Sequence, residues 1–362
     1  MIKFIRANGK LISTPAFFPD ATRAVIKSLT PHDLADAGVE GIVINTYHLL
    51  FTPGSKIIKK AGGAHKFMNF KGHIISDSGG FQMLSLIHKS KKFGKITDKG
   101  IKLTYPGFKE VLFTPEKCID AQFDLGSDIM ICLDDCPGID ASKKEIDESV
   151  ERTVKWAERC KKRFQENLNK NGNSTNRPLL FAVVQGGSYT ALRVNCAKAL
   201  VKLSFDGYAF GGWPMTRKNE LDIKFLKLVS DNTPKNSAKY ALGVGKPEEI
   251  AKCVKMGYSI FDCVLPTRDA RHKRLYVFNK NPSKTKDLTK RSFYGYLDLG
   301  KTMYSNNKGP IDKYCSCYAC KHYTRSYIHH LFKIKDSLAH RLCTIHNVYM
   351  YTTVIKRIRE LG

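Results

Sequence analysis

Acidic and amide side chains follow several short apolar runs of this 362-residue chain. Asp134, Gln185 and Asp262 come directly after such runs, Asp77 follows one after a single serine, and Gly212 is the second residue of a glycine pair after another. A single aspartate after a strand is commonly a helix cap. Three carboxylates, a glutamine and several glycine pairs in corresponding places are harder to explain that way. Two such carboxylates suffice for one nucleophile and one proton carrier, the requirement for breaking a glycosidic bond.

The same residues suit a planar ligand that forms hydrogen bonds. A carboxylate such as Asp134 can accept two N–H donors from the edge of guanine, while Gln185 and the Gly212 N–H can donate to its carbonyl oxygen. Asp135 is the neighbour of Asp134, so only one of the two is expected to face the pocket. The pattern fits a glycosidase or an enzyme that exchanges a base at the C1′ atom of a nucleotide.

A second cluster consists of thiols. Cys315, Cys317 and Cys320 lie within six residues, and thiolates so close are unfavourable unless a cation shares their charge. Three cysteines and one histidine form a closed tetrahedral Zn²⁺ site, which predicts a structural ion; free or redox-active thiols are the alternative. Spacing alone leaves the fourth ligand open among His322, His329, His330, His340 and His346.

The chain is strongly basic. It has 60 Lys and Arg against 33 Asp and Glu, a net charge of +27, with basic runs at 89–102 and 268–291. This excess favours a polyanionic partner, although a proteome rich in lysine would also produce it. Eleven cysteines, mostly scattered singly, fit reduced thiols in the cytoplasm. No run is long enough for a membrane span, and we expect no secretion signal.

Eight short apolar runs predict the elements that must position these side chains. Most alternate with helix-length amphipathic segments, which favours an α/β fold of the (β/α)8 TIM-barrel class over a doubly wound sheet. We expect an inserted hairpin at 94–113, a surface loop at 165–178 and a final helix from about Asn347. The expected strands are centred on residues 16–18, 42–44, 74–75, 129–133, 180–184, 208–210, 240–242 and 260–261.

With these residues in view, the chain resembles the bacterial type of tRNA-guanine transglycosylases over nearly its whole length. The resemblance rests on motifs that occur together in this order: Asn45-Thr46-Tyr47-His48-Leu49, Asp77-Ser78-Gly79-Gly80-Phe81-Gln82, Gln185-Gly186-Gly187, Gly243-Val244-Gly245-Lys246-Pro247, Phe261-Asp262-Cys263-Val264-Leu265-Pro266-Thr267-Arg268 and Cys315-x-Cys317-x2-Cys320 with His346-Asn347. It implies a barrel over residues 1–285, a zinc-binding subdomain over 286–346, and a C-terminal helix over 347–362 that packs back on the barrel.

The resemblance also implies roles for individual residues. Asp262 would be the nucleophile that attacks C1′ of the target guanosine, and Asp77 the proton acceptor and shuttle. His346 would be the fourth ligand of one Zn²⁺ per chain. The implied base-binding residues are Asp77, Ser78, Gly79, Gly80, Phe81, Asp134, Cys136, Gln185, Gly212 and Leu242, with Phe81 and Leu242 on either side of the base. The implied RNA-binding residues are Gly243, Val244, Gly245, Lys246, Pro247, Glu248, Glu249, Thr267, Arg268, Asp269, Ala270 and Arg271.

The expected activity is therefore exchange of guanine in tRNAs with GUN anticodons for a 7-deazaguanine base, by a homodimer. A DNA-modifying paralogue and a non-catalytic tRNA-binding subunit are the alternatives. The sequence leaves open which base is incorporated, because Trp213-Pro214-Met215 departs from the bacterial pattern and Arg217 replaces its glutamate. We expect the Arg217 charge to disfavour a cationic aminomethyl base. Asp20 lies in a second departure, Pro19-Asp20-Ala21-Thr22, near the first strand.

Overall fold

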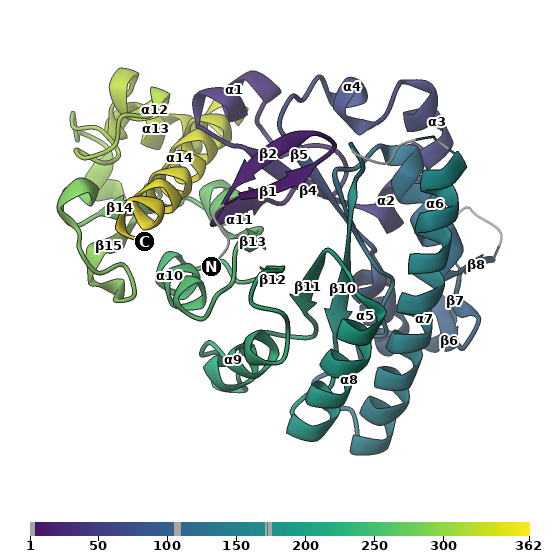
Figure 1. The fold of residues 1–362 in the computed structure, drawn as a ribbon. Coiled ribbons are helices and arrows are strands. Elements are labelled where there is room, and N and C mark those ends of the chain that lie inside the picture. Colours follow the sequence, from purple (N-terminus) through teal and green to yellow (C-terminus); the bar gives the residue numbers. More distant parts are fainter. Residues whose placement is uncertain (1–3, 105–109, 171, 173–175) are drawn as a thin grey trace.

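A computed structural model describes residues 4–104, 110–170, 172 and 176–362 of the chain. Its centre is an eight-stranded parallel sheet in the order β3-β13-β12-β11-β10-β9-β5-β4, flanked by helices (Figure 1). The two end strands approach each other through a parallel bridge between Asp20 and Val43, so the sheet is nearly closed as a barrel. The eight strands are β3 (Ala16–Pro19), β4 (Gly41–Asn45), β5 (His73–Asp77), β9 (Ile129–Ile131), β10 (Leu179–Val184), β11 (Gly207–Phe210), β12 (Ala238–Ala241) and β13 (Ile260–Cys263). The predicted (β/α)8 class is confirmed.

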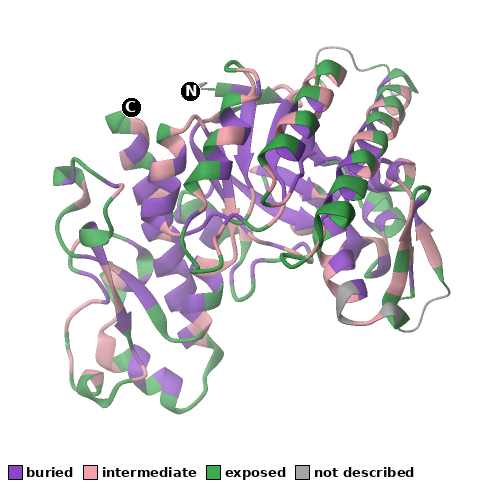
Figure 2. Cartoon of the chain, turned by 90° about the horizontal axis from the view of Figure 1, so that it is seen from below, coloured by how far each residue is buried: buried purple, intermediate pink, exposed green. Residues whose placement is uncertain are grey.

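Helices cover the outside of the barrel, and their outward faces are exposed while the strands are buried (Figure 2). They are α1 (Pro31–Asp36), α2 (Thr46–Phe51), α3 (Ser55–Lys60), α4 (Ala64–Met68), α5 (Gly80–Lys89), α6 (Pro115–Leu125), α7 (Lys143–Lys170), α8 (Thr190–Leu203), α9 (Ile223–Asp231), α10 (Pro247–Lys255) and α11 (Leu265–Arg271). In helix α1, Thr30 is the N-cap and Pro31 occupies the first turn, a local start signal. Helix α7 continues to Lys170, so the predicted loop at 165–178 is wrong at its start; residues 171 and 173–175 lie outside the described chain.

Two small antiparallel sheets are attached to the barrel. The hairpin β1 (Phe4–Ala7) and β2 (Lys10–Ser13) contributes Ile5, Ala7 and Ile12 to the apolar cluster that fills the barrel interior. The insertion between β5 and β9 is a three-stranded sheet of β6 (Gly94–Thr97), β7 (Gly100–Leu103) and β8 (Val111–Phe113). The predicted hairpin is therefore present with an added strand, while 105–109, which include Pro106-Gly107, are outside the described residues.

The C-terminal part begins with an antiparallel pair, β14 (Arg274–Phe278) and β15 (Tyr294–Asp298). It continues through α12 (Tyr318–His322) and α13 (Arg325–Lys333) to the long helix α14 (Ser337–Leu361). Asp336 caps α14, so this helix begins well before the predicted start near Asn347. The division at 285/286 falls inside the β14–β15 hairpin, and the three-part division of the chain stays a prediction.

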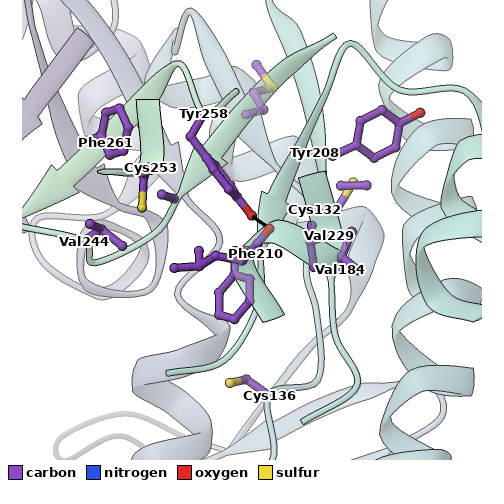
Figure 3. Packing of buried hydrophobic residues seen from close by; sticks show 14 of the residues in the cluster. Cys132, Cys136, Val184, Tyr208, Phe210, Val229, Val244, Cys253, Tyr258 and Phe261 are labelled. Atoms are coloured by element: carbon purple, nitrogen blue, oxygen red, sulfur yellow. Dashed lines mark hydrogen bonds between the residues drawn. The ribbon is translucent and has the colours of Figure 1, made fainter. Parts of the chain in front are cut away.

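The apolar core lies in layers on both sides of the strands. One cluster fills the barrel interior, and a larger one packs the outer strand faces against the helices. Figure 3 shows part of the larger cluster, in which Tyr258 packs near Phe210 and its hydroxyl donates to the Leu226 carbonyl at 2.9 Å. Strands buried on both faces produce the unbroken apolar runs from which the sheet was predicted.

Candidate functional site at the barrel mouth

The predicted base-binding residues converge because parallel strands place their carboxyl ends at one mouth of the barrel. Asp77 ends β5, Asp262 lies in β13, and Asp134, Gln185 and Gly212 follow β9, β10 and β11. Gln185 donates through Nε2 to Oδ2 of Asp134 at 2.6 Å, across 51 residues of sequence. Burial raises the pKa of Asp134 to about 6, although the bond from Gln185 opposes this shift. A carboxylate and an amide thus share one buried wall of the mouth.

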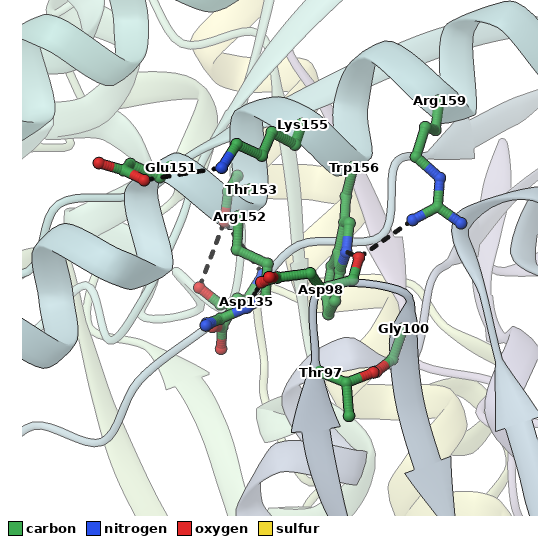
Figure 4. Close-up of polar contacts among 10 residues, drawn as sticks. All are labelled: Thr97, Asp98, Gly100, Asp135, Glu151, Arg152, Thr153, Lys155, Trp156 and Arg159. Atoms are coloured by element: carbon green, nitrogen blue, oxygen red, sulfur yellow. Dashed lines mark hydrogen bonds and ion pairs between the residues drawn. The ribbon is translucent and has the colours of Figure 1, made fainter.

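Asp135 is held apart from this wall, as the prediction that only one of the pair faces the pocket requires. It pairs with Arg152 of α7, and its backbone N–H donates to the Thr153 hydroxyl at 3.0 Å (Figure 4). The Ser149 hydroxyl donates to its carbonyl at 2.9 Å. Asp135 therefore anchors α7 to the barrel and leaves Asp134 for the mouth.

Asp77 is bonded by an amide from the neighbouring strand. Nδ2 of Asn45, at the end of β4, donates to Asp77 Oδ2 at 2.7 Å. Burial, followed by the charge of Asp134, raises the pKa of Asp77 to about 7. A carboxyl group with this pKa can both give and take a proton near neutral pH, which a proton carrier requires.

The glycines after Asp77 allow backbone to approach the carboxylates closely. Gly79 has a φ of +84°, and a Cβ there would lie 2.4 Å from Cβ of Tyr47. A Cβ on Gly80 would lie 3.0 Å from the carbonyl oxygen of Asp134. The buried Ser78 hydroxyl accepts the Gly80 N–H at 3.2 Å. This tight turn begins α5 and leaves the Phe81 side chain 48% exposed.

Asp262 lies on the other side of the mouth and is partly exposed. Its Oδ1 accepts the backbone N–H of Gly243 at 3.0 Å, from the segment that follows β12. Burial raises the pKa of Asp262 to about 7, against the effect of the Gly243 N–H. The Tyr240 hydroxyl is fully buried nearby, and burial followed by the charge of Asp262 raises the Tyr240 pKa. Leu242, at the end of the same strand segment, is partly exposed.

The two predicted RNA-binding segments border Asp262, but many of their side chains point inward. Gly243 and Arg268 are exposed, and Lys246 and Arg271 are partly exposed. The buried members include Glu248, which accepts the Tyr294 hydroxyl at 2.7 Å, and others with internal roles: Val244, Gly245, Pro247, Glu249, Thr267, Asp269 and Ala270. Side-chain contact with RNA would therefore fall mainly to the exposed members.

The loop after β11 is fixed by contacts that the sequence did not reveal. Arg193 of α8 is buried, and its guanidinium donates to the carbonyl oxygens of Val184, Gly187 and Gly211 at 2.7–3.1 Å. At the other end of the loop, Arg217 pairs with Asp140 at 2.9 Å, and both side chains are largely exposed. The Asp140 carboxylate offsets part of the Arg217 charge, and the repulsion of a cationic base by Arg217 stays a prediction.

The Cys315, Cys317 and Cys320 thiols lie together with the imidazole of His346. The four ligand atoms are within 4.8 Å of one another. Nδ1 of His346 lies 3.3 Å from Sγ of Cys320, while Nε2 lies 2.7 Å from the carbonyl oxygen of Tyr276. A carbonyl can only accept, so Nε2 carries the proton and Nδ1 presents a lone pair to the thiols. Among the described residues, this Cys3His group fits a closed Zn²⁺ site, and it selects His346 from the five candidates.

The metal-binding group is connected to the barrel through the next residue of α14. Asn347 accepts the Tyr276 N–H at 3.1 Å and donates to the carbonyl of Pro266 at 2.9 Å. Pro266 lies in α11, four residues after Asp262. The folding of the metal-binding region and the position of the segment after β13 are thus coupled.

Four polar residues at or near the mouth are not among the predicted site residues. Asn45 belongs to the Asn45-Thr46-Tyr47-His48-Leu49 motif and follows an apolar run, so the strand-end signal could have identified it. Tyr240 lies inside an apolar run, where its sequence context is that of a core residue. Arg193 lies within a helical segment, and its local sequence does not distinguish it from a surface arginine. Asp20 was noted only as a departure from the family pattern.

Comparison with known proteins gives consistent results. The family model described as queuine tRNA-ribosyltransferase matches residues 3–361. A queuine tRNA-ribosyltransferase of Caldanaerobacter subterraneus subsp. tengcongensis is 41% identical over 351 residues, covering 97% of this chain and 86% of the relative. The protein of the same name from Methylacidiphilum infernorum is 38% identical over 352 residues, covering 97% and 88%. That from Staphylococcus epidermidis is 38% identical over 348 residues, covering 96% and 85%.

Proposed function

Since the chain belongs to the queuine tRNA-ribosyltransferase family of pentosyltransferases, we propose that it is a tRNA-guanine transglycosylase. It exchanges the wobble guanine of tRNAs with GUN anticodons for a 7-deazaguanine base, through a covalent Asp262–ribose intermediate. The observation that carries this proposal is the convergence of Asp77, Asp134 with Gln185, and Asp262 at one mouth. A barrel that only bound RNA would need none of these buried acids.

Base recognition is proposed for the wall opposite the nucleophile. Asp134 accepts two N–H donors from the guanine edge, and Gln185 and the Gly212 N–H donate to its carbonyl oxygen. This requires the Gln185 amide to turn from Asp134, to which it donates at 2.6 Å. The exposed ring of Phe81 and the side chain of Leu242 cover the two faces of the base, and Cys136, buried beside Asp134, completes the wall.

The reaction proceeds in two displacement steps at C1′. An Asp262 oxygen forms a bond to C1′ while the C1′–N bond breaks, and the leaving guanine keeps the bonding pair and takes up one proton. The incoming base then loses a proton from its ring nitrogen, forms a bond to C1′ and releases the Asp262 carboxylate. Asp77 carries the proton in both steps, which its pKa of about 7 suits.

The basic charge of the chain supports RNA as the polymer substrate. Arg268, in the segment after Asp262, is exposed, and Lys246, which donates to Glu249, is partly exposed; the Gly243 N–H in the second segment donates to Asp262. All eleven cysteines are free, which fits the reducing cytoplasm where tRNA is modified. No helix of the described part of the chain is long and apolar enough to cross a membrane.

One structural Zn²⁺ per chain is proposed at Cys315, Cys317, Cys320 and His346. Four protein ligands leave no open coordination position, so the ion supplies stability and no chemistry of the exchange. It would hold α12 against α14 and, through Asn347, the segment after β13.

A homodimer is proposed from an aromatic cluster at the surface of α12, α13 and the turn between them, made of Tyr318, Tyr323 and Tyr327. The rings of Tyr323 and Tyr327 stack with centroids 5.6 Å apart, and Tyr318 and Tyr327 are 47% and 42% exposed. Aromatic side chains of this kind are enriched at protein interfaces. Sedimentation analysis should give a dimer for the wild type and a monomer for Tyr327→Asp; a monomeric wild type would refute this part.

The decisive experiment supplies the enzyme with a GUN-anticodon tRNA transcript, or in parallel with duplex DNA, and with each candidate base: guanine, an aminomethyl deazaguanine and queuine. Mass spectrometry of the nucleosides should show the new base in place of the wobble guanine. Incorporation into duplex DNA but not tRNA would favour the DNA-modifying paralogue. Binding of tRNA without exchange of any base would favour a non-catalytic subunit.

A further inference from the structure

Asp20 is a carboxylate at the mouth that has no role in the reaction described above. Side chains alternate between the two faces of a strand, so every second residue of a barrel strand points inward. Three strands lead from a residue of the interior apolar cluster to an aspartate two positions later: Phe18 to Asp20, Ile75 to Asp77 and Ile260 to Asp262. The three aspartates therefore belong to one layer at the top of the barrel interior.

The backbone around Asp20 links it to the other members of this layer. Thr22 donates its N–H and its hydroxyl to Oδ1 of Asp20, at 2.9 and 2.7 Å, which orients the carboxylate. Asp20 bridges Val43 where the barrel closes, and the Thr22 carbonyl accepts the Asn45 N–H at 3.1 Å. Asn45 in turn holds Asp77 at 2.7 Å. One turn thus fixes Asp20 relative to Asp77.

Charged groups from several elements surround the three carboxylates. The charge of Asp20 adds to burial in raising the pKa values of both Asp77 and Asp262, and for Asp77 it adds to the larger effect of Asp134. Asp20 also interacts with the cation Arg271. Among the described residues, the titratable and charged groups around the layer include Asp134, Cys118, Tyr240, Cys263, His48, Arg23 and Arg271.

We propose that Asp20 is a positioning residue whose negative charge keeps one proton on the Asp77–Asp262 pair of the free enzyme. The proposal rests on the proposed exchange reaction, in which the leaving guanine takes up one proton and the incoming base returns one. If Asp77 and Asp262 were both ionised beside the charged Asp20, the three carboxylates would repel one another strongly. The pair is thereby held as one acid and one nucleophile at neutral pH, which is the state that the first step needs.

Asp20→Asn tests this with little change of shape, because an asparagine oxygen can still accept from Thr22. The profile of kcat/KM for tRNA against pH should move to lower pH on both limbs, by on the order of 0.5 pH unit, the effect of one unit charge several ångströms away in water. The variant should then be about threefold slower than the wild type at high pH and about threefold faster at low pH. Asp20→Glu keeps the charge and should retain the wild-type midpoints.

Asp36→Asn is the matched control, since Asp36 is an exposed residue of α1 that pairs with His32. Its profile should equal that of the wild type. A uniform loss of rate at every pH in Asp20→Asn, or two unmoved limbs in a folded variant, would overturn the proposal.

A titration of the free enzyme separates this proposal from the proposed function. In protein with ¹³C-labelled aspartate carboxyls, Asp77→Asn and Asp262→Asn assign the resonances of Asp77 and Asp262 and separate them from that of Asp134, which also titrates at elevated pH. Asp20→Asn should lower both midpoints. If the wild type did not exchange bases, the proposed function would be refuted. The titration midpoints of Asp77 and Asp262 would still test the effect of Asp20. Unchanged midpoints would refute the role of Asp20 even in an enzyme that exchanges bases.

Discussion

The barrel mouth and the Cys3His group both bring polar side chains together, but they differ in whether these side chains can find a compensating partner. At the thiols, four ligand atoms lie within 4.8 Å and the spare nitrogen of His346 is bonded to Tyr276, so a single cation completes the set. At the mouth, burial raises the pKa values of three aspartates, and no cation of the described chain is paired with Asp77 or Asp262 within salt-bridge distance.

This difference indicates opposite contributions to stability. A complete donor set stabilises the fold when its metal binds. Carboxylates held where ionisation is unfavourable destabilise the folded state at neutral pH, and such sites are characteristic of catalysis. We therefore expect substitutions at the mouth to abolish activity without loss of stability. Substitutions at the thiols should lower stability, and any loss of activity should follow from that.

The largest expected effect is on the nucleophile. Asp262→Asn should lower kcat/KM for guanine exchange by about 10⁴-fold or more, because the covalent step is lost. Mixing the wild type with tRNA and an unreactive base analogue should trap a denaturant-resistant complex that Asp262→Asn does not form. A covalent band in the variant would show that another residue is the nucleophile.

The next effect is at the metal-binding group. Cys317→Ala should lose the metal and lower the free energy of unfolding by about 5 kcal/mol. Metal analysis of the purified wild type should give one Zn per chain. Cys343→Ala is the matched control, since Cys343 is a buried cysteine of α14 outside the four-residue group, and it should retain the metal. A wild type that is folded without zinc would contradict this prediction.

A smaller effect should appear in the stability of the mouth. The pKa of Asp77 is about 7 in the folded protein against an ordinary value of 3.8, so the stability that its protonation provides is present below pH 4 and lost as the pH rises through 7. Asp77→Asn removes this loss and should be more stable than the wild type at pH 8 by about 1 to 3 kcal/mol, with water access at the mouth reducing the full effect. Chemical denaturation at pH 4 and pH 8 measures this. If Asp77→Asn changed the free energy of unfolding equally at pH 4 and pH 8, the Asp77 carboxyl would not ionise between these pH values in the folded protein.

The smallest effect concerns RNA binding at the edge of the mouth. Arg268→Ala should weaken tRNA binding and lower the slope of log K against log salt by up to about 1, the value of one phosphate contact. Arg271→Ala should have a smaller effect, because its guanidinium already donates to the Thr267 carbonyl at 2.7 Å. Lys227→Ala, which removes an exposed cation paired with Asp231 on α9, should leave the slope unchanged. Equal slopes for all four proteins would place both arginines outside the RNA contact.

The local sequence was sufficient for the barrel strands and for the thiol cluster. A strand that is buried on both faces is mostly apolar, so it can be recognised as an apolar run in the sequence. In a parallel barrel, the residues that follow each such run lie at the same mouth. Three cysteines within six residues likewise specify a metal-binding group before any folding is considered. The Thr30-Pro31 start of α1 is equally local, because a cap acts within its own turn.

Only the tertiary structure decided which polar residues meet. Asn45 holds Asp77 because β4 and β5 pair in one register, and Arg193 reaches Gly211 because α8 packs against β10, which pairs with β11. The choice of His346 depends on where α14 packs on β14, and Arg217 meets Asp140, which comes from another loop. Strand register and the closure of the barrel set these contacts. They depend on the packing of the whole chain, and no short segment of sequence encodes them.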